Sequence, residues 1–218
     1  MKPIAFLAVA LLTAPASAET FSVTLGGKSL GQLNYSESGT TRRLTSTVDN
    51  TPLGVFNGTF AGTSTGSDNK SRFTGESRSS RKQRTVKVNI AQGRATAIDI
   101  TPKDEQTELS EAARVPAGVT DPVRAMGQLF RAKGCPAPIQ MYDGRRVVSM
   151  RSDAGTKTGN TLTCTLRYKV IAGPGHLSPL GISSAKMQLN YATSGDRQTL
   201  QEMKVSSGIF RLSLDRKD

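Results

Sequence analysis

The sequence predicts a mainly β protein, in which an antiparallel sheet curls or closes into a barrel-like domain with one short packed α-helix. Two patterns support this prediction. Polar and apolar residues alternate through about ten short segments, as they do in half-buried strands. Glycine-rich or Asp-Gly turns separate many of these segments, which favours antiparallel neighbours. A sheet of this size must curl or close to protect its edges.

The first eighteen residues have the order of a cleavable secretory signal peptide. Lys2 gives a charged start, residues 4–12 are apolar, and Ala16-Ser17-Ala18 provides an A-x-A cleavage site. The apolar run is too short to span a bilayer, which takes about 20 residues; a buried N-terminal helix is the alternative. We therefore expect a periplasmic protein with no transmembrane segment after cleavage, in which residues 19–218 form a single β-rich domain.

The N-terminal half of that domain predicts a series of hairpins. Apolar residues alternate with polar ones over 20–25, and Gly26-Gly27 then forms a turn. The further strands expected here are 30–36, 42–49 and 53–60, and a hairpin follows over 86–100.

Residues 61–84 interrupt the alternation. Most are Gly, Ser, Thr or charged, which predicts a flexible loop or a long hairpin tip with few buried groups. The basic end of this segment holds the densest positive cluster in the chain: Arg78, Arg81, Lys82 and Arg84. Such a run is commonly a solvated face, and a binding site for anions is the sharper alternative.

One helix is expected after residue 120. Thr120 or Asp121 can cap it, and Pro122 suits the first helical position. Apolar residues over 123–130 share one face, and Gly134 ends the helix. Because this face is narrow, packing on the sheet is favoured over lying on a membrane.

The C-terminal half returns to strands. Asp143-Gly144 between two β segments predicts a two-residue hairpin turn, because both of its residues take positive φ. Residues 162–170 alternate strictly, which directs Cys164 inward. The remaining expected strands are 185–192, 199–205 and 209–214.

The chain contains two cysteines, Cys135 and Cys164. An even number in an exported protein favours a disulfide, here one that stabilises by roughly 3–4 kcal/mol through a loop of about 30 residues. A metal pair or a reactive thiol is the alternative, but a metal needs further ligands and the chain has one histidine. We predict the disulfide, and neither a metal nor a cofactor.

The formal charge is +12, and it falls to +11 when the signal peptide removes one lysine. This balance favours anionic partners through long-range attraction. Outside the cytoplasm these are lipid head groups, phosphates of lipopolysaccharide or acidic polysaccharides, and not nucleic acid. The absence of tryptophan argues against a stacking platform for bases or sugars. A basic surface that only keeps the protein soluble is the alternative.

The order of motifs in the second half is similar to that of a known family. The helix start Asp121-Pro122 and Cys135 are followed by Tyr142-Asp143-Gly144-Arg145-Arg146, then Cys164-Thr165-Leu166-Arg167-Tyr168 and Ile171-Ala172-Gly173. On these motifs the chain resembles the bacterial domain of unknown function 3108 family, loosely over residues 20–214 and specifically over 121–173. The resemblance implies an antiparallel, barrel-like envelope protein, and it carries over no catalytic residues.

The Asp143-Gly144-Arg145-Arg146 turn is the sharpest candidate binding motif. Two arginines at a hairpin tip can fork onto phosphate or carboxylate, although neighbouring strand residues point to opposite faces. The alternative is a turn with solvated arginines. The candidate anion-binding residues are Arg145, Arg146, Arg167 and Lys169, together with the cluster of Arg81, Lys82 and Arg84.

Catalysis is less favoured by the sequence. The single histidine, His176, lies in a Gly-Pro-Gly-His segment and is a weak candidate general base. The chain contains no metal-binding histidine spacing and no nucleotide-binding loop. Four acids, Asp104, Glu105, Glu108 and Glu111, fall in a segment that we expect to be exposed.

We therefore expect a non-catalytic periplasmic envelope protein. Its curled sheet would enclose an apolar interior, and basic residues at the rim would meet a lipid or other anionic amphiphile, or a membrane surface. One alternative is a hydrolase of envelope polymers that uses His176 or the acids near Glu108. The other is a protein-interaction module of an envelope complex. The sequence leaves the ligand and the oligomeric state open.

Overall fold

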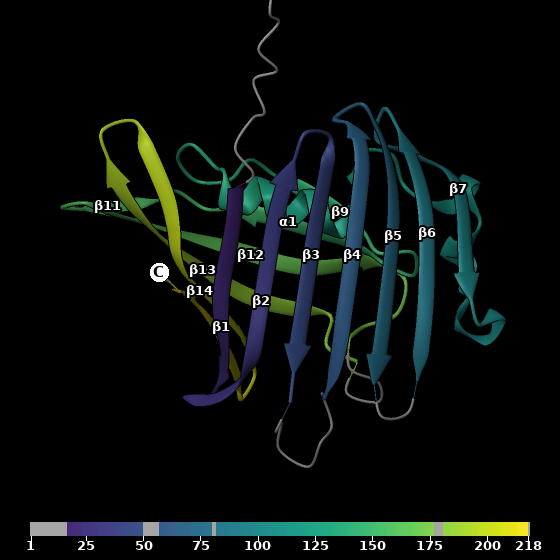
Figure 1. Cartoon of the computed structure of the whole chain (residues 1–218), viewed down its shortest axis with the longest axis horizontal. Helices are drawn as coiled ribbons and strands as arrows, with labels where there is room; N and C mark the ends of the chain where they lie inside the picture. Colours follow the sequence, from purple (N-terminus) through teal and green to yellow (C-terminus); the bar gives the residue numbers. More distant parts are fainter. Residues whose placement is uncertain (1–16, 50–56, 80–81, 177–180, 218) are drawn as a thin grey trace, which may run out of the picture.

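The computed structural model describes residues 17–49, 57–79, 82–176 and 181–217. In this part of the chain a single, mainly antiparallel sheet forms a nearly closed barrel around one short helix, so the predicted fold class is confirmed (Figure 1). Residues 1–16 of the expected signal peptide lie outside the described residues, as do residues 53–56 of the strand expected at 53–60.

The strands follow each other around the barrel in the order β7-β6-β5-β4-β3-β2-β1-β15-β14-β13-β12-β10-β9-β8. The first half contains β1 (Ser17–Leu25), β2 (Lys28–Ser38), β3 (Thr41–Val48), β4 (Gly58–Ser67), β5 (Lys70–Ser79), β6 (Gln83–Ala91) and β7 (Arg94–Thr101). The second contains β8 (Val119–Thr120), β9 (Ile139–Tyr142), β10 (Val147–Ser152), β11 (Thr156–Thr158), β12 (Thr161–Ala172), β13 (Ser184–Ser194), β14 (Arg197–Ser207) and β15 (Phe210–Lys217).

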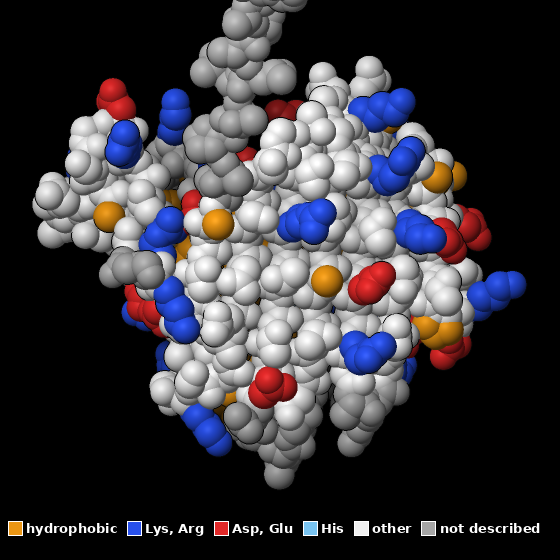
Figure 2. Space-filling view, viewed as in Figure 1, with side chains coloured by type: hydrophobic (Ala, Val, Ile, Leu, Met, Phe, Trp, Pro, Cys, Tyr) orange, Lys and Arg blue, Asp and Glu red, His pale blue; other side chains and the backbone are white. Residues whose placement is uncertain are grey.

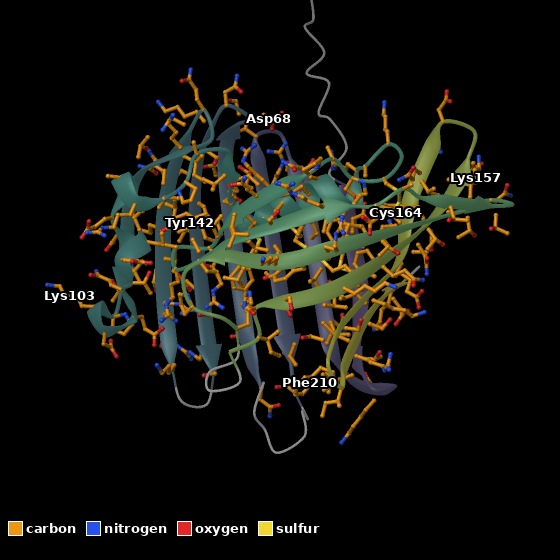
Figure 3. The ribbon with its side chains drawn as sticks, turned by 180° about the vertical axis from the view of Figure 1, so that it is seen from behind. Asp68, Lys103, Tyr142, Lys157, Cys164 and Phe210 are labelled. Atoms are coloured by element: carbon orange, nitrogen blue, oxygen red, sulfur yellow. A yellow bond between two sulfur atoms is a disulfide. The ribbon has the colours of Figure 1, made fainter. Side chains whose placement is uncertain are left out.

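Two walls make up the barrel. Strands β1 to β7 form one wall, and β9, β10 and β12 to β15 cross it at an angle as the other (Figures 1 and 3). The antiparallel pairing of β1 with β15 joins the walls through strands from opposite ends of the chain. Three 3-10 helices, η2 (Lys103–Glu105), η3 (Glu108–Ser110) and η4 (Ala112–Arg114), pack beside β7 and so cover that edge.

Helix α1 (Pro122–Phe130) lies between the walls at the end of the barrel where β2 ends and β3 begins (Figure 1). Asp121 caps it, as the sequence predicts. Phe130 stacks on Phe21 of β1 with ring centroids 5.1 Å apart, and Tyr191 of β13 donates a hydrogen bond to a carbonyl oxygen in the last turn. The helix therefore packs against both walls and closes this end, which we call the helix end.

The buried carboxylate of Asp121 fixes the helix to the first wall. Its Oδ1 accepts a hydrogen bond from the Arg124 backbone N–H, and its Oδ2 accepts hydrogen bonds from Ser64 of β4 at 2.7 Å and Ser71 of β5 at 3.1 Å. The buried Arg124 guanidinium donates to Ser64 Oγ and to the Gly66 carbonyl oxygen. Removing one member of such a network leaves the others buried without partners.

The segment 61–84 is not a flexible loop; it is closer to the predicted long hairpin, but it contains buried residues that the prediction did not include. Strands β4 and β5 cover most of it and pair along their whole length. Its small residues allow α1 to come close, because a Cβ atom at Gly62 would lie 2.9 Å from the Val123 side chain. Ser64 and Ser71 supply hydroxyl groups to the helix cap. Small polar residues that serve close packing have the same composition as a loop, which is why the prediction failed.

The connection between β9 and β10 also differs from the expected two-residue turn. It contains four residues, 143–146, of which only Gly144 has a positive φ, at 94°. The Asp143 carboxylate accepts hydrogen bonds from two backbone N–H groups of the turn at 2.9 Å and holds it open. Glycine is required at 144 for a second reason, because a Cβ atom there would lie 2.5 Å from the Val86 side chain of β6.

The disulfide between Cys135 and Cys164 is present, with Cα atoms 5.6 Å apart. Cys164 is fully buried on the inward face of β12, as the alternation predicts. The bridge ties the segment that follows α1 to the second wall.

Packing inside the barrel changes from one end to the other. Near the helix end the inward side chains are buried, for example Tyr35, Leu189 and Leu200 at 0–1% exposure. Toward the opposite end, which we call the far end, many inward apolar side chains are only half-buried. We call this set the apolar rim: Leu25 of β1, Leu33 of β2, Val48 of β3, Phe60 of β4, Val170 of β12, Val205 of β14 and Leu212 of β15.

The Asp121 network predicts a large loss of stability on mutation. Asp121→Ala removes the helix cap and the buried carboxylate 3.6 Å from Arg124 Nε, and it leaves the Ser64 and Ser71 hydroxyl groups without their acceptor. The free energy of unfolding should therefore fall by about 3–5 kcal/mol. Glu111→Ala, at an acid 69% exposed, is the matched control and should change it by less than about 0.5 kcal/mol. Urea denaturation measures both, and equal effects of the two variants would contradict this role of Asp121.

Candidate functional site

Polar side chains gather at the far end, where three separate segments meet. The turn 143–146 joins β9 to β10, residues after β12 continue the inward face of that strand, and η2 follows β7. We call this group the inner polar cluster: Lys82, Arg84, Glu105, Asp143, Arg145, Arg146, Tyr168 and His176.

Arg146 is the most buried cation of the cluster, with its side chain 7% exposed. Its Nε lies 3.1 Å from Asp143 Oδ2, but the contact lacks hydrogen-bond geometry. Nε and Nη1 are both buried and have no hydrogen-bond partner among the described residues. An unmade hydrogen bond of this kind costs about 1–3 kcal/mol, and more for a charged group. Arg146 therefore holds donors that an incoming anion could satisfy.

The backbone beside Arg146 explains a glycine of the Ile-Ala-Gly motif. Gly173 has φ of 82°, and a Cβ atom there would lie 2.3 Å from the Arg145 carbonyl oxygen and 2.9 Å from the Arg146 Cα. The chain leaving β12 can pass this close to the turn 143–146 only with glycine at this position.

Glu105 gathers the other cations of the cluster. This buried carboxylate receives Lys82 Nζ at 2.5 Å, Arg145 Nη1 at 2.9 Å and Arg84 Nη1 at 3.0 Å. Burial alone would raise the pKa of Glu105, but the hydrogen bond from Lys82 and the two guanidinium charges outweigh it and hold the pKa below its ordinary value. Burial lowers the pKa of Arg145, whose Nε also has no hydrogen-bond partner among the described residues. One carboxylate for three cations leaves an excess of positive charge.

His176 and Tyr168 form the neutral side of the cluster. The Tyr168 hydroxyl and His176 Nε2 share a hydrogen bond of 2.5 Å. Burial, helped by the charge of Arg146, lowers the pKa of His176 to about 4, so the imidazole is neutral at pH 7. Burial raises the pKa of Tyr168 above its ordinary value. A histidine with so low a pKa is a weak general base near neutral pH.

The structure brings part of the predicted anion-binding set together. Lys82, Arg84 and Arg145 meet at one carboxylate, and Arg146 occupies the neighbouring position of the turn. Arg81 lies outside the described residues. Arg145 and Arg146 contact different carboxylates, Glu105 and Asp143, although both lie in the turn 143–146 and not in a strand.

Arg167 and Lys169 do not belong to this group. Leu166 and Tyr168 face the interior from β12, so the residues that alternate with them face outward. Arg167, 74% exposed, forms an ion pair with Asp153 at 2.8 Å. The predicted common site of the turn arginines with Arg167 and Lys169 is therefore wrong.

Glu105 is buried, although the sequence predicts an exposed segment around it. Glu105 is 4% exposed, and its partners come from β6 and from the turn 143–146. No local pattern indicates this burial, because the cations that make it possible are distant in sequence.

Other kinds of site are less well supported in the described part of the chain. It contains no group of three or more His, Cys, Asp or Glu residues placed to hold a metal ion. No described helix is long and apolar enough to cross a membrane. A pocket of about 520 Å³ beside α1 contains arginines, but these pair with acids: Arg42 with Glu37 at 2.8 Å, and Arg124 with Asp68 at 2.9 Å.

Comparison with known proteins gives one finding. A family model described as a protein of unknown function (DUF3108) matches residues 20–177, which include both cysteines, the turn 143–146 and His176. The match agrees with the resemblance expected from the motifs. Neither the curated proteins nor the solved structures gave a match.

The low pKa of His176 predicts a specific pH dependence. In the unfolded chain the imidazole takes up a proton below pH about 6.5, whereas in the folded chain it does so only near pH 4. Stability should therefore fall as the pH falls through this window, by at most about 3 kcal/mol from this group.

Urea denaturation near pH 7 and again near pH 4.5 checks this dependence. The His176→Gln variant should lose less stability between the two conditions than the wild type. Tyr168→Phe, which keeps the histidine, should retain the full drop. Equal drops in His176→Gln and the wild type would mean that His176 titrates normally in the folded protein.

Proposed function

This chain belongs to the domain of unknown function 3108 family, and from the inner polar cluster we propose that it is a non-catalytic binding protein of the cell envelope. Its ligand is an anionic amphiphile. The head group binds at Arg146, and the apolar chain lies along the apolar rim. The observation that carries the proposal is the pair of buried Arg146 nitrogens without hydrogen-bond partners.

The apolar rim and the inner polar cluster occupy the same end of the barrel. Strand register links them directly, because one row of paired residues runs across β6, β5, β4, β3 and β2. The row consists of Arg84, Ser77, Phe60, Ser46 and Leu33, each paired with the next. These residues are all half-buried, and in their strands they alternate onto the inward face. A ligand with a charged head and an apolar tail fits this change from guanidinium groups to Phe60 and Leu33.

The charges of the cluster favour a carboxylate or phosphate head group. Three guanidinium groups and Lys82 face two carboxylates, Glu105 and Asp143, while His176 is neutral. Arginine binds both kinds of anion through parallel hydrogen bonds, and such bonds are strengthened by burial.

The envelope location rests on two features. The disulfide between Cys135 and Cys164 is typical of an oxidising compartment. The pattern of residues 1–18 is that of a secretory signal peptide. Together they support export to the periplasm, where anionic amphiphiles include lipids and their breakdown products.

Displacement of a fluorescent fatty acid tests the ligand class. The purified protein should bind dansyl-labelled undecanoic acid, and both dodecanoate and dodecyl phosphate should displace it, whereas dodecanol should not. Arg146→Gln should weaken binding by roughly tenfold or more, because a hydrogen-bonded charge is lost. Whichever anion displaces the probe at the lower concentration identifies the preferred head group.

Two variants serve as controls. Arg167→Gln removes the same charge from the outer face of β12 and should leave binding unchanged. Because Arg146→Gln leaves Asp143 without its partner, the double variant Arg146→Gln/Asp143→Asn should be compared with it and should bind as weakly. Unchanged binding in both Arg146 variants, or equal losses in Arg146→Gln and Arg167→Gln, would count against the proposed site.

A further inference from the structure

The turn between β14 and β15 exposes an isoleucine. Ser207 pairs with Phe210, so Gly208 and Ile209 form the tip of this hairpin. Ile209 is 90% exposed, and the one other large apolar side chain exposed in the described residues, Ile171, is 45% exposed. Turn tips normally carry Gly, Asn, Asp or Ser. An isoleucine at this position is not explained by packing or by the requirements of the turn.

Basic residues lie on the strands beside this tip. Lys186 of β13, Lys204 of β14 and Arg211 of β15 are exposed on the outer face and line a hollow of about 530 Å³. Strand register makes them neighbours, because Ser206 pairs with both Lys186 and Arg211. Figure 2 shows Lys and Arg side chains, with some acidic ones among them, along the left edge of the molecule.

A second turn adds to the same surface. The Gly26 backbone N–H of the β1–β2 turn donates a hydrogen bond of 3.0 Å to the Arg211 carbonyl oxygen, which fixes the two turns side by side. Lys28 begins β2 at this turn and is exposed. The nearby acid Glu202 already pairs with Lys204 at 2.7 Å. We call Lys28, Lys186, Lys204, Ile209 and Arg211 the tip surface.

The tip surface lies at the far end of the barrel. Phe210, next to Ile209, is at the end opposite to Asp68 and α1 (Figure 3). Leu25 and Leu212 of the apolar rim pair with each other directly above the two turns. Any partner that covers the tip surface therefore lies next to the apolar rim.

We propose that the tip surface docks the protein onto a membrane that contains anionic lipids. Ile209 inserts between the lipid head groups, and Lys28, Lys186 and Arg211 lie against lipid phosphates, while Lys204 stays paired with Glu202. Charge complementarity selects this partner, because an exposed apolar side chain surrounded by lysine and arginine is the combination that binds anionic membrane interfaces. Docking in this orientation turns the apolar rim toward the bilayer. The docking surface does not depend on the proposed ligand at Arg146.

The absence of tryptophan from the chain allows a direct test. Ile209→Trp introduces a single tryptophan at the tip, and Ile171→Trp places one at the other exposed isoleucine as the matched control. With vesicles of phosphatidylethanolamine and phosphatidylglycerol at low salt, the emission of Ile209→Trp should shift to shorter wavelength and that of Ile171→Trp should not. Neither variant should respond to vesicles of phosphatidylcholine alone.

Vesicle flotation with further variants completes the test. Ile209→Ser should reduce the bound fraction roughly tenfold, because burial of one isoleucine is lost. Lys186→Gln/Arg211→Gln should weaken binding most at low salt. Ile209→Ser should still bind dansyl-labelled undecanoic acid, and Arg146→Gln should still bind vesicles, so the two proposals can fail separately. An unshifted emission of Ile209→Trp together with no flotation of the wild type would overturn membrane docking and would indicate a protein partner for Ile209.

Discussion

The buried carboxylate of Asp121 is the contact on which the architecture depends. It caps α1 and accepts hydrogen bonds from hydroxyl groups of β4 and β5, so it fixes the helix to these two strands of the first wall. Because the chain has one α-helix in its described part, that helix can close one end of the barrel and not the other. Gly62 leaves room for the helix, since a Cβ atom there would lie 2.9 Å from the Val123 side chain, and Ser64 and Ser71 supply the hydroxyl groups that Asp121 binds.

The two ends of the barrel differ in packing, and this difference determines where a ligand could bind. At the helix end the apolar side chains are packed and the charged groups have partners, as Arg124 has in Asp68. At the far end, apolar side chains are half-buried, and Arg146 carries buried donors without partners. The turn 143–146 and Glu105 both lie where strands of the two walls end on this side. A ligand site and a docking surface at the same end would let an amphiphile pass between the membrane and the barrel without crossing water.

Much of this fold could be predicted because its signals are local. The alternation of polar and apolar residues predicts most of the strands, and Asp121-Pro122 predicts the start of the helix. The even number of cysteines predicts the disulfide. The length and burial of β4 and β5 escaped prediction because small polar residues under a helix resemble a loop in composition. Glu105 escaped because its burial depends on cations brought together only by the fold. The turn arginines could be identified, but no local pattern indicates that Arg146 is buried. The alternation over 162–170, in contrast, already directs Arg167 outward.

The central claim is that the half-buried rim and Arg146 together hold one anionic amphiphile inside the barrel. A crystal structure of the protein with a fatty acid brominated at its terminal carbon tests this most directly, because the anomalous signal of bromine locates the tail independently of the protein. We expect the bromine among the inward side chains of the apolar rim, with the carboxylate at Arg146. Bromine on the outer surface, or a carboxylate bound away from Arg146 with the rim empty, would contradict the account.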